Sequence, residues 1–336
     1  MMLLRATRRL VVLATLLLPL AACEQETATV VLRLAHSLDT AHPVHQAMLV
    51  MDRRLREISG DTMRIDIYPA GQLGNERELI ELLQIGSLAM TKVSASPLEG
   101  FVPVMKVFNL PYVFRNREHY HAVLDSEVGR DLLSAPTRVR LRGLGYYDAG
   151  ARSFYTVDRP VNTPEDLDGL KIRVQESPTA LNMVTALGGA PTPIAWGELY
   201  TALQQGVVDG AENNPPSFYL SGHYEICKYY TLDEHTAVPD ILLVSTFVWE
   251  SLKPQQQAWL QQAVDDSVVF QRNLWASESD KALKAVAAAG VEIIRPDKTH
   301  FQQRVASLQD SYVGTPVGEI LQRIAAVPDE EVVSVE

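Results

Sequence analysis

Cysteine is scarce in this 336-residue sequence, which contains only Cys23 and Cys227. Cys23 ends an N-terminal segment with the features of an export signal, so the rest of the chain has one thiol. One thiol cannot form an intramolecular disulfide, and zinc sites built from several thiolates are excluded. Cys227 lies among aromatic residues, and we expect it to be a small buried thiol.

Positive charge is also in deficit, with 30 lysines and arginines against 41 aspartates and glutamates and a formal net charge of -11. The first 22 residues contain three arginines and no acid, so their removal leaves 27 basic residues and a charge of -14. Nucleic-acid binding needs basic patches, and this composition argues against it. An anionic ligand would have to be captured by a local site, because the overall field repels it.

A hydrophobic run long enough to cross a membrane is missing as well. The apolar run from Leu10 to Leu18 is too short for a comfortable span, and arginines precede it. It is followed by Leu20-Ala-Ala-Cys23, which resembles a bacterial lipobox. We therefore predict a lipoprotein signal peptide over 1–22, lipidation of Cys23 and a tether over 23–29. The protein would be exported to the periplasm and held on a membrane by its acyl chains.

The chain beyond the signal peptide exceeds what one hydrophobic core usually serves, which predicts two domains. Its periodicity alternates between short strands and helices, which favours an α/β fold with mostly parallel sheets. Ligands of such sheets bind at the carboxyl ends of the strands. The expected strands cover 30–35, 63–68, 89–93, 171–174, 190–194 and 207–211, and the expected helices cover 44–58, 79–85, 177–187 and 196–205.

Residues 255–289 contain neither proline nor glycine and carry apolar residues at roughly helical spacings. This pattern predicts one long helix that crosses the whole molecule. Two packed helices joined near Ser277 fit the pattern nearly as well.

Two arginines and an asparagine stand in three short phrases, Asp148-Ala-Gly-Ala-Arg152, Leu170-Lys-Ile-Arg173 and Asp209-Gly-Ala-Glu-Asn213. A guanidinium group presents a planar fork of donors that matches a carboxylate. Taken singly, each of these residues is more often an ordinary solvated or locally paired side chain. Together they predict a site for one carboxylate.

Motifs of enzymes are absent from the sequence. It contains no Gly-x-Ser-x-Gly elbow, no His-Glu-x-x-His and no phosphate-binding Walker loop, and Gly143, Gly145 and Gly150 do not fit dinucleotide spacing. His42 and His45 are separated by a proline and a helix start that should point their rings apart. We therefore expect no enzymatic activity, no cofactor and no metal site.

The order of these and other phrases resembles the solute-binding proteins of tripartite ATP-independent periplasmic (TRAP) transporters. The further phrases include Pro69-Ala-Gly-Gln-Leu-Gly74, Asn109-Leu-Pro-Tyr-Val-Phe114 and Pro191-Thr-Pro-Ile-Ala-Trp196. The resemblance covers nearly the entire exported chain. It implies a two-lobed periplasmic binding protein fold with hinge strands and a long helix spanning both lobes. Lobe I is expected at 30–149 plus 239–277, lobe II at 150–238 plus 278–325, and a C-terminal tail at 326–336.

The resemblance also implies an organic acid in the cleft between the lobes and delivery of that acid to a TRAP permease. Arg173 would pair with the carboxylate, Arg152 would add a second positive contact, and Asn213 would donate from the facing loop. Several phrases resemble the branch that binds hexuronates such as glucuronate and galacturonate. The remaining candidate ligand-binding residues are His36, Asn75, Glu76 and Lys92 in the first lobe and Gln175, Asn214 and His235 in the second.

Each of these residues has a structural alternative. Asn75 and Glu76 also fit helix capping, Lys92 fits a solvated strand end, and His235 fits a satisfied buried imidazole. A C4-dicarboxylate would need a second cation, which Lys92 or His36 could supply, so that class of ligand stays open. A lipoprotein that senses a ligand and signals to a receptor would have the same cleft.

Overall fold

The computed structural model describes residues 29–329. The predicted signal peptide, Cys23, nearly all of the tether and residues 330–336 of the expected tail lie outside the described residues. Within the described part, no helix combines the length and the apolar character needed to cross a membrane.

Lobe I is built on a five-stranded sheet in the order β2-β1-β3-β10-β4. Its first three strands pair in parallel, and β10 runs antiparallel to both of its neighbours. The strands are β1 (Val30–Ala35), β2 (Met63–Tyr68), β3 (Met90–Ser94), β4 (Leu141–Tyr147) and β10 (Asp240–Ser245). The helices of this lobe are α2 (Pro43–Ser59), α3 (Glu76–Gln84), α4 (Ala95–Leu98), α5 (Arg117–Asp125), α6 (Glu127–Ser134) and α10 (Thr246–Ser251).

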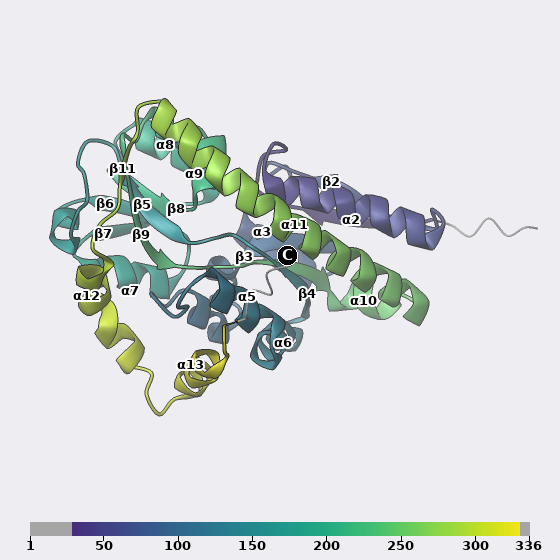
Figure 1. Cartoon of the computed structure of the whole chain (residues 1–336). Coiled ribbons are helices and arrows are strands. Elements are labelled where there is room, and N and C mark those ends of the chain that lie inside the picture. Colours follow the sequence, from purple (N-terminus) through teal and green to yellow (C-terminus); the bar gives the residue numbers. More distant parts are fainter. Residues whose placement is uncertain (1–28, 330–336) are drawn as a thin grey trace, which may run out of the picture.

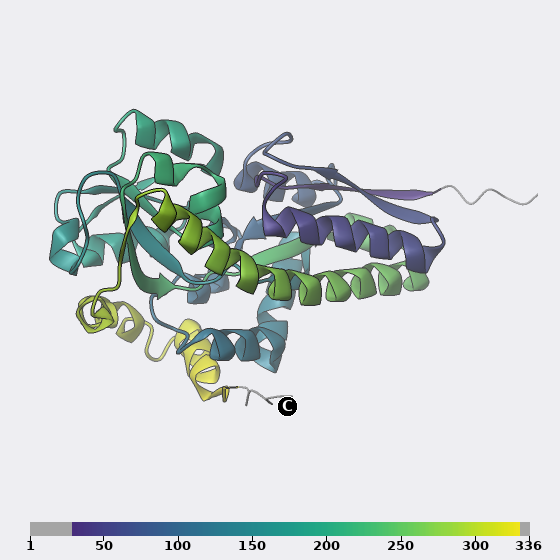
Figure 2. The same ribbon diagram turned by 45° about the horizontal axis from the view of Figure 1, so that its top comes forward.

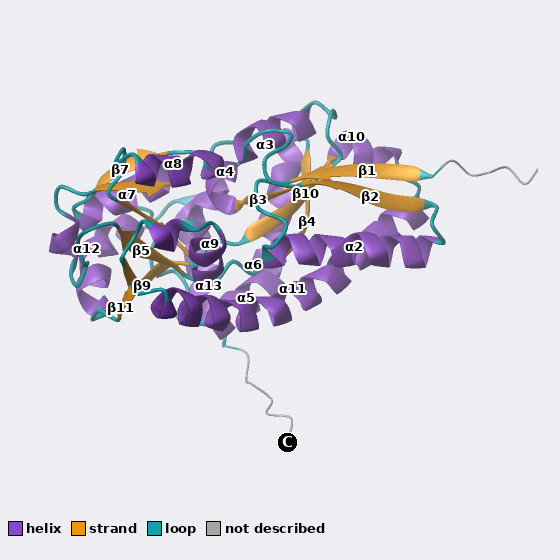
Figure 3. Ribbon diagram, turned by 90° about the horizontal axis from the view of Figure 1, so that it is seen from above, coloured by secondary structure: helices purple, strands orange, loops and turns teal. Residues whose placement is uncertain are grey.

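Lobe II is built on a six-stranded sheet in the order β11-β9-β5-β8-β6-β7. The strands are β5 (Arg152–Thr156), β6 (Lys171–Val174), β7 (Ala190–Pro193), β8 (Gly210–Asn213), β9 (Tyr229–Thr236) and β11 (Glu292–Ile294). Its helices are α7 (Pro178–Leu187), α8 (Leu199–Gln204), α9 (Pro215–Leu220) and α12 (Lys298–Asp310). Figure 3 shows the two sheets at opposite ends of the molecule.

Both sheets are mixed. Five strand pairings are parallel and four are antiparallel. The antiparallel pairings all involve β10 or β5, because the chain leaves lobe I through β4 into β5 and returns through β9 into β10. The α/β prediction is confirmed, and the parallel character is strongest in β1, β2 and β3 and in β6, β7 and β8, away from these crossings.

Local sequence signals fix several helix ends. The imidazole of His42 accepts a hydrogen bond from the Val44 amide at the start of α2, and Gly60, with φ of 58°, ends that helix in the left-handed region. Asn75, which the sequence made a candidate for helix capping, forms a capping box with Glu78 at the start of α3. The strand expected at 207–211 begins later, at Gly210, because the Val207 amide closes the α8 turn on Ala202 at 2.9 Å.

A single helix, α11 (Pro254–Ala288), spans both lobes (Figures 1 and 2). Its 35 residues are about 52 Å long at the usual helical rise. The alternative of two helices joined near Ser277 is wrong, since that hydroxyl bonds to the Leu274 carbonyl within the continuous helix. Gln271 of α11 also holds the β4–β5 crossing, because its side-chain amide bonds to both the amide and the carbonyl of Asp148, at 2.8 and 2.7 Å.

The last helix, α13 (Pro316–Ala326), packs on lobe I. Ile324 joins the core of that lobe, and Arg115 donates to the carbonyls of Ala325 and Val327 at 3.0 and 2.8 Å. The expected extension of lobe II to residue 325 is therefore corrected, since the chain returns to lobe I after α12. Apolar burial decides the position of this amphipathic helix, and its sequence does not show which lobe covers it.

Candidate functional site

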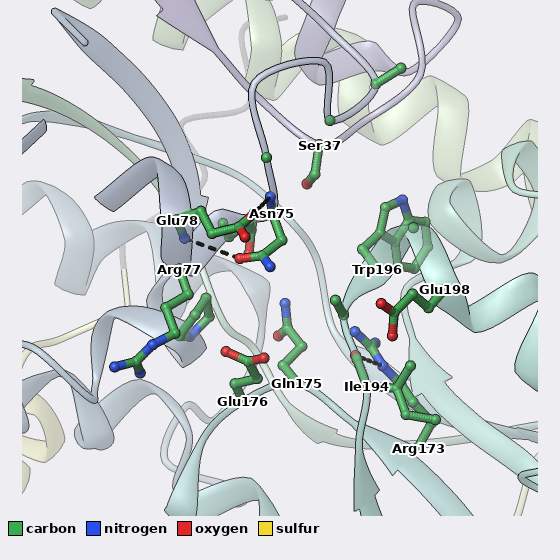
Figure 4. Close-up of a pocket in the computed structure, with 17 residues that line it drawn as sticks. Ser37, Asn75, Arg77, Glu78, Arg173, Gln175, Glu176, Ile194, Trp196 and Glu198 are labelled. Atoms are coloured by element: carbon green, nitrogen blue, oxygen red, sulfur yellow. Dashed lines mark hydrogen bonds between the residues drawn. The ribbon is translucent and has the colours of Figure 1, made fainter. Parts of the chain in front are cut away.

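A cleft separates the carboxyl ends of β1 and β3 in lobe I from those of β6 and β8 in lobe II. It contains a cavity of about 380 Å³ and a smaller adjoining cavity of about 40 Å³. Figure 4 shows Ser37 and Asn75 of lobe I facing Gln175 and Trp196 of lobe II across the larger cavity. Such a position between strand ends is the usual ligand site of α/β proteins.

Arg173 lies at the end of β6, on the wall of the larger cavity. It is 2% exposed, its Nε donates to the Ile194 carbonyl at 2.8 Å, and its guanidinium carbon lies 5.9 Å from the centre of the Trp196 ring. Its Nη1 is buried without a hydrogen-bond partner, and no acid of residues 29–329 forms an ion pair with it. Burial lowers the pKa of Arg173, because the loss of hydration outweighs the favourable effects of Tyr155 and Glu212. A ligand carboxylate would add the compensation that is missing.

Arg152 lies on β5, which β8 separates from β6, and it differs from Arg173 because its charge is already neutralised. It forms a buried ion pair with Glu212, and its Nη2 donates to the Glu212 carbonyl at 2.8 Å. Its Nη1 donates to Oδ1 of Asn213 at 2.9 Å, and the same oxygen accepts from the Asn214 amide at 2.9 Å. The side-chain oxygen of Asn213 therefore already accepts two hydrogen bonds, which leaves its side-chain Nδ2 to donate into the cleft. Asn213 and Asn214 both line the smaller cavity.

His235 lies behind this pair and not on the cleft. It is fully buried, with Nδ1 2.8 Å from Asp233 and Nε2 3.5 Å from Glu212. Burial by itself would lower the pKa of His235, but the two carboxylates outweigh it and raise the pKa to about 9. The structure does not bring His235 to either cleft cavity, and it lines a different cavity on the other side of the hinge crossings. This position agrees with the alternative interpretation of His235 as a buried structural imidazole.

His36 is also buried beside the cleft without lining it. Its Nε2 lies 3.0 Å from Nδ1 of His45, and its Nδ1 accepts from the Leu38 amide at 3.2 Å. Burial, with smaller effects of Lys92 and His45, lowers the pKa of His36 to about 3. The ring is therefore neutral near pH 7, and the neighbouring Ser37 lines both cavities instead.

Lys92 is held by two carboxylates. Its side chain is 3% exposed, and its Nζ lies 3.1 Å from Glu76 Oε1 and 3.0 Å from Asp240 Oδ1. Burial would lower the pKa of Lys92, but Asp240 and Glu76 raise it. The expectation of a solvated strand end is wrong for this residue. One ammonium between two carboxylates leaves this wall of the cleft with excess negative charge.

The remaining candidates have mixed positions. Asn75 lines the larger cavity while its Oδ1 caps α3 by accepting from the Glu78 amide at 3.0 Å, so its capping role and its place on the cleft coexist. Gln175 lines both cavities and accepts a hydrogen bond from the Ser94 hydroxyl of the opposite lobe at 3.1 Å.

Ser37, Trp196 and Asp240 are three of the cleft residues that were not singled out from the sequence. The sequence offered a clue for Asp240, because this charged residue stands directly before the apolar run Ile-Leu-Leu-Val, which is typical of a buried strand. Trp196 ends one of the quoted family phrases, and its aromatic ring suits a sugar-binding wall. Ser37 has no feature in the sequence that distinguishes it from other loop serines.

Comparison with known proteins finds solute-binding proteins among both the families and the solved structures. The family described as bacterial extracellular solute-binding protein, family 7, matches residues 34–314. A TRAP periplasmic solute-binding protein from Bradyrhizobium, solved in complex with galacturonate, is 40% identical with a TM-score of 0.85, covering 87% of this chain and 98% of that one. Another from Pseudomonas putida F1, solved with bound D-glucuronate, is 36% identical with a TM-score of 0.86, covering 90% and 98%.

The C4-dicarboxylate-binding periplasmic protein of Rhodobacter capsulatus is 30% identical over 304 residues, or 88% of each chain. Relatives named for different ligands thus resemble this chain, and the family alone does not select the solute. With two lobes, a cleft at the strand ends and a family match over most of its length, this chain belongs to the family 7 bacterial extracellular solute-binding proteins and is a TRAP solute-binding protein.

Proposed function

We propose that this protein captures a hexuronate, such as glucuronate or galacturonate, in its cleft and delivers it to a TRAP permease. The observation that carries the proposal is the buried guanidinium of Arg173, which faces the cavity without an acidic partner among the described residues. A carboxylate placed there would accept charge-assisted hydrogen bonds from a guanidinium that is almost fully buried.

The opposite wall supports a solute with one acid group and several hydroxyls. Glu76 and Asp240 line the cleft, and both can accept hydrogen bonds from hydroxyl groups. Asn75, Asn213 and Gln175 add amides that pair with neutral oxygens. This distribution matches a sugar acid, whose carboxylate lies at one end and whose ring carries the hydroxyls.

A C4-dicarboxylate fits the same wall poorly. Its second carboxylate would need a free cation, but Lys92 is already paired with Glu76 and Asp240, and His36 is neutral near pH 7. Bringing another negative charge beside two buried carboxylates is unfavourable. The charge balance of the cleft therefore favours uronates over dicarboxylates.

Within this proposal, Arg173 pairs with the carboxylate and Asn213 donates a hydrogen bond to it. Arg152 lines the smaller cavity, but its guanidinium is already paired with Glu212, so we assign it a supporting role and not the main contact with the carboxylate. It fixes the side chain of Asn213 through the hydrogen bond that its Nη1 donates to Oδ1. His36 and His235 support the cleft from positions behind its wall.

A ligand panel tests the proposal directly. Mature protein is melted with glucuronate, galacturonate, succinate, malate or no ligand. A ligand at 100 times its Kd stabilises the folded state by about 2.7 kcal/mol, so a uronate should raise the melting temperature by roughly 4 °C. Stabilisation by succinate without stabilisation by either uronate would overturn the assignment. Uronate binding without uronate uptake in cells that carry the permease would favour a ligand-sensing role.

We also propose that the protein is exported and lipidated on Cys23, as its lipobox-like sequence suggests. Mass spectrometry of the mature N-terminus checks this. An N-terminus other than a diacylated or triacylated Cys23 would remove the membrane anchor from the proposal and leave solute binding unaffected.

A further inference from the structure

A buried glutamate of lobe I makes hydrogen bonds to lobe II beside the cleft. Glu99, which follows α4, is 5% exposed and has no cationic partner within residues 29–329. Its Oε2 accepts from the Ser177 hydroxyl at 2.6 Å and its Oε1 from the Thr179 hydroxyl at 2.7 Å. Asn109 of its own lobe donates to Oε2 at 3.3 Å and holds the carboxylate in place. The two cross-lobe bonds lie within the short range typical of hydroxyl–carboxylate pairs.

The partners of Glu99 lie at the start of α7, where Ser177 is the N-cap. An ionised carboxylate is favoured at this end of a helix because the unpaired amides there carry partial positive charge. Glu99 therefore bonds to a surface of lobe II that suits its charge. The contact between Glu99 and these two hydroxyls is made of hydrogen bonds, which can form and break if the lobes move.

The same short segment of lobe II carries the solute site. Arg173 and Gln175 line the cavity, and Ser177 and Thr179 follow a few residues later. Gln175 is itself bonded across the cleft to Ser94 at 3.1 Å. A movement of lobe II that brings Arg173 toward lobe I thus brings the hydroxyls of Ser177 and Thr179 toward Glu99.

We propose that Glu99 is a positioning residue that latches lobe II onto lobe I in the closed state and so slows the release of the solute. This inference deepens the proposed function, on which it rests for the identity of the solute. Glu99 itself does not line the cavities described above. Glu99 stabilises the closed arrangement of the lobes. Because the solute on Arg173 is bound in that arrangement, this stabilisation also strengthens solute binding.

The variant Thr179→Val tests the latch, because valine keeps the shape of threonine and removes only the hydroxyl. Thr185→Val is its matched control on the same helix, since the Thr185 hydroxyl bonds to the Leu181 carbonyl within α7 at 2.9 Å. Glu99→Gln is a second test that keeps the side-chain volume. Affinity and release rate are measured with glucuronate, and the lobe separation is measured between nitroxides at Gln72→Cys and Thr201→Cys, exposed positions in the two lobes.

We expect Thr179→Val to raise the Kd about tenfold, mainly through faster release, as for the loss of a hydrogen bond to a charged group. Glu99→Gln should act in the same direction, and both should widen the distribution of lobe separations without solute. Thr185→Val should match the parent protein in both measurements. An unchanged Kd and unchanged separations in Thr179→Val and Glu99→Gln would overturn the latch, even if their melting temperatures fell. If the parent binds no uronate, the separations without solute still decide the question.

Discussion

Replacing Arg173 by methionine should separate solute capture from folding stability. Methionine has a similar length and can keep the apolar contacts beside Trp196, but it removes the guanidinium charge. Arg173 is buried without an acidic partner among the described residues, so its removal also relieves the cost of keeping a charge away from water. The unliganded variant should therefore melt at the same temperature as the parent or at a higher one.

The loss of binding should be large. A carboxylate held by two charge-assisted hydrogen bonds gains about 1.5 to 3 kcal/mol from each, or about 3 to 6 kcal/mol together. The Kd should rise by a factor of about 10² to 10⁴. Arg173→Lys should recover only part of this, because an ammonium group cannot reproduce the planar fork.

The matched comparison is Arg152→Met. Arg152 is also buried, but its loss leaves Glu212 without its guanidinium partner. Breaking a buried ion pair from one side typically costs about 3 to 5 kcal/mol, so this variant should be much less stable without ligand. Isothermal titration calorimetry with glucuronate gives the affinities, and urea unfolding without ligand gives the stabilities.

The reverse pattern would contradict these roles of the two arginines. If Arg173→Met unfolds several kcal/mol more easily than the parent yet binds glucuronate with unchanged affinity, Arg173 is a structural residue and the carboxylate binds elsewhere. Equal losses of stability in Arg173→Met and Arg152→Met would also contradict the distinction between a free and a paired guanidinium.

Three further predictions concern buried titratable groups. Lys92→Met should lower the free energy of unfolding by about 3 to 5 kcal/mol in urea titrations, because Glu76 and Asp240 lose their shared cation; a smaller loss than in a Glu76→Gln control would contradict this. The pKa of His235 is raised to about 9, so its contribution to stability is complete below pH 6.5 and is lost as the pH rises through 9. Urea titrations from pH 6.5 to 9.5 should show a decline on the order of 3 kcal/mol that His235→Asn flattens, and an equal decline in that variant would refute the assignment. Burial raises the pKa of the Cys227 thiol, so a thiol reagent should label it only when the protein unfolds; rapid labelling of the native protein would show that the site opens.

Much of the fold follows from local patterns. The helix that starts at Asn75 has a capping box in its sequence, and the helix from Pro254 contains no residue that would break it until Gly290. The choice between one long helix and two could not be made locally, because it depends on whether both lobes offer surfaces along the whole length of α11. The position of α13 on lobe I could not be predicted locally either, because it depends on which lobe offers an apolar surface to this helix.

The sequence by itself determined that Arg173 stands at the end of a strand, next to a helix that begins at Ser177, and that the exported chain is too acidic to attract an anion except at a local site. Only the tertiary structure decided which cations are free to bind that anion. Glu212 on β8 neutralises Arg152, and Asp240 on β10, together with Glu76, holds Lys92, while Arg173 has no such partner among the described residues. The partners of Arg152 and Lys92 come from distant parts of the chain, so ion pairing and burial depend on strand register and lobe packing. The sequence identifies the types of residue at the cleft, and long-range contacts decide which of their charges are already paired.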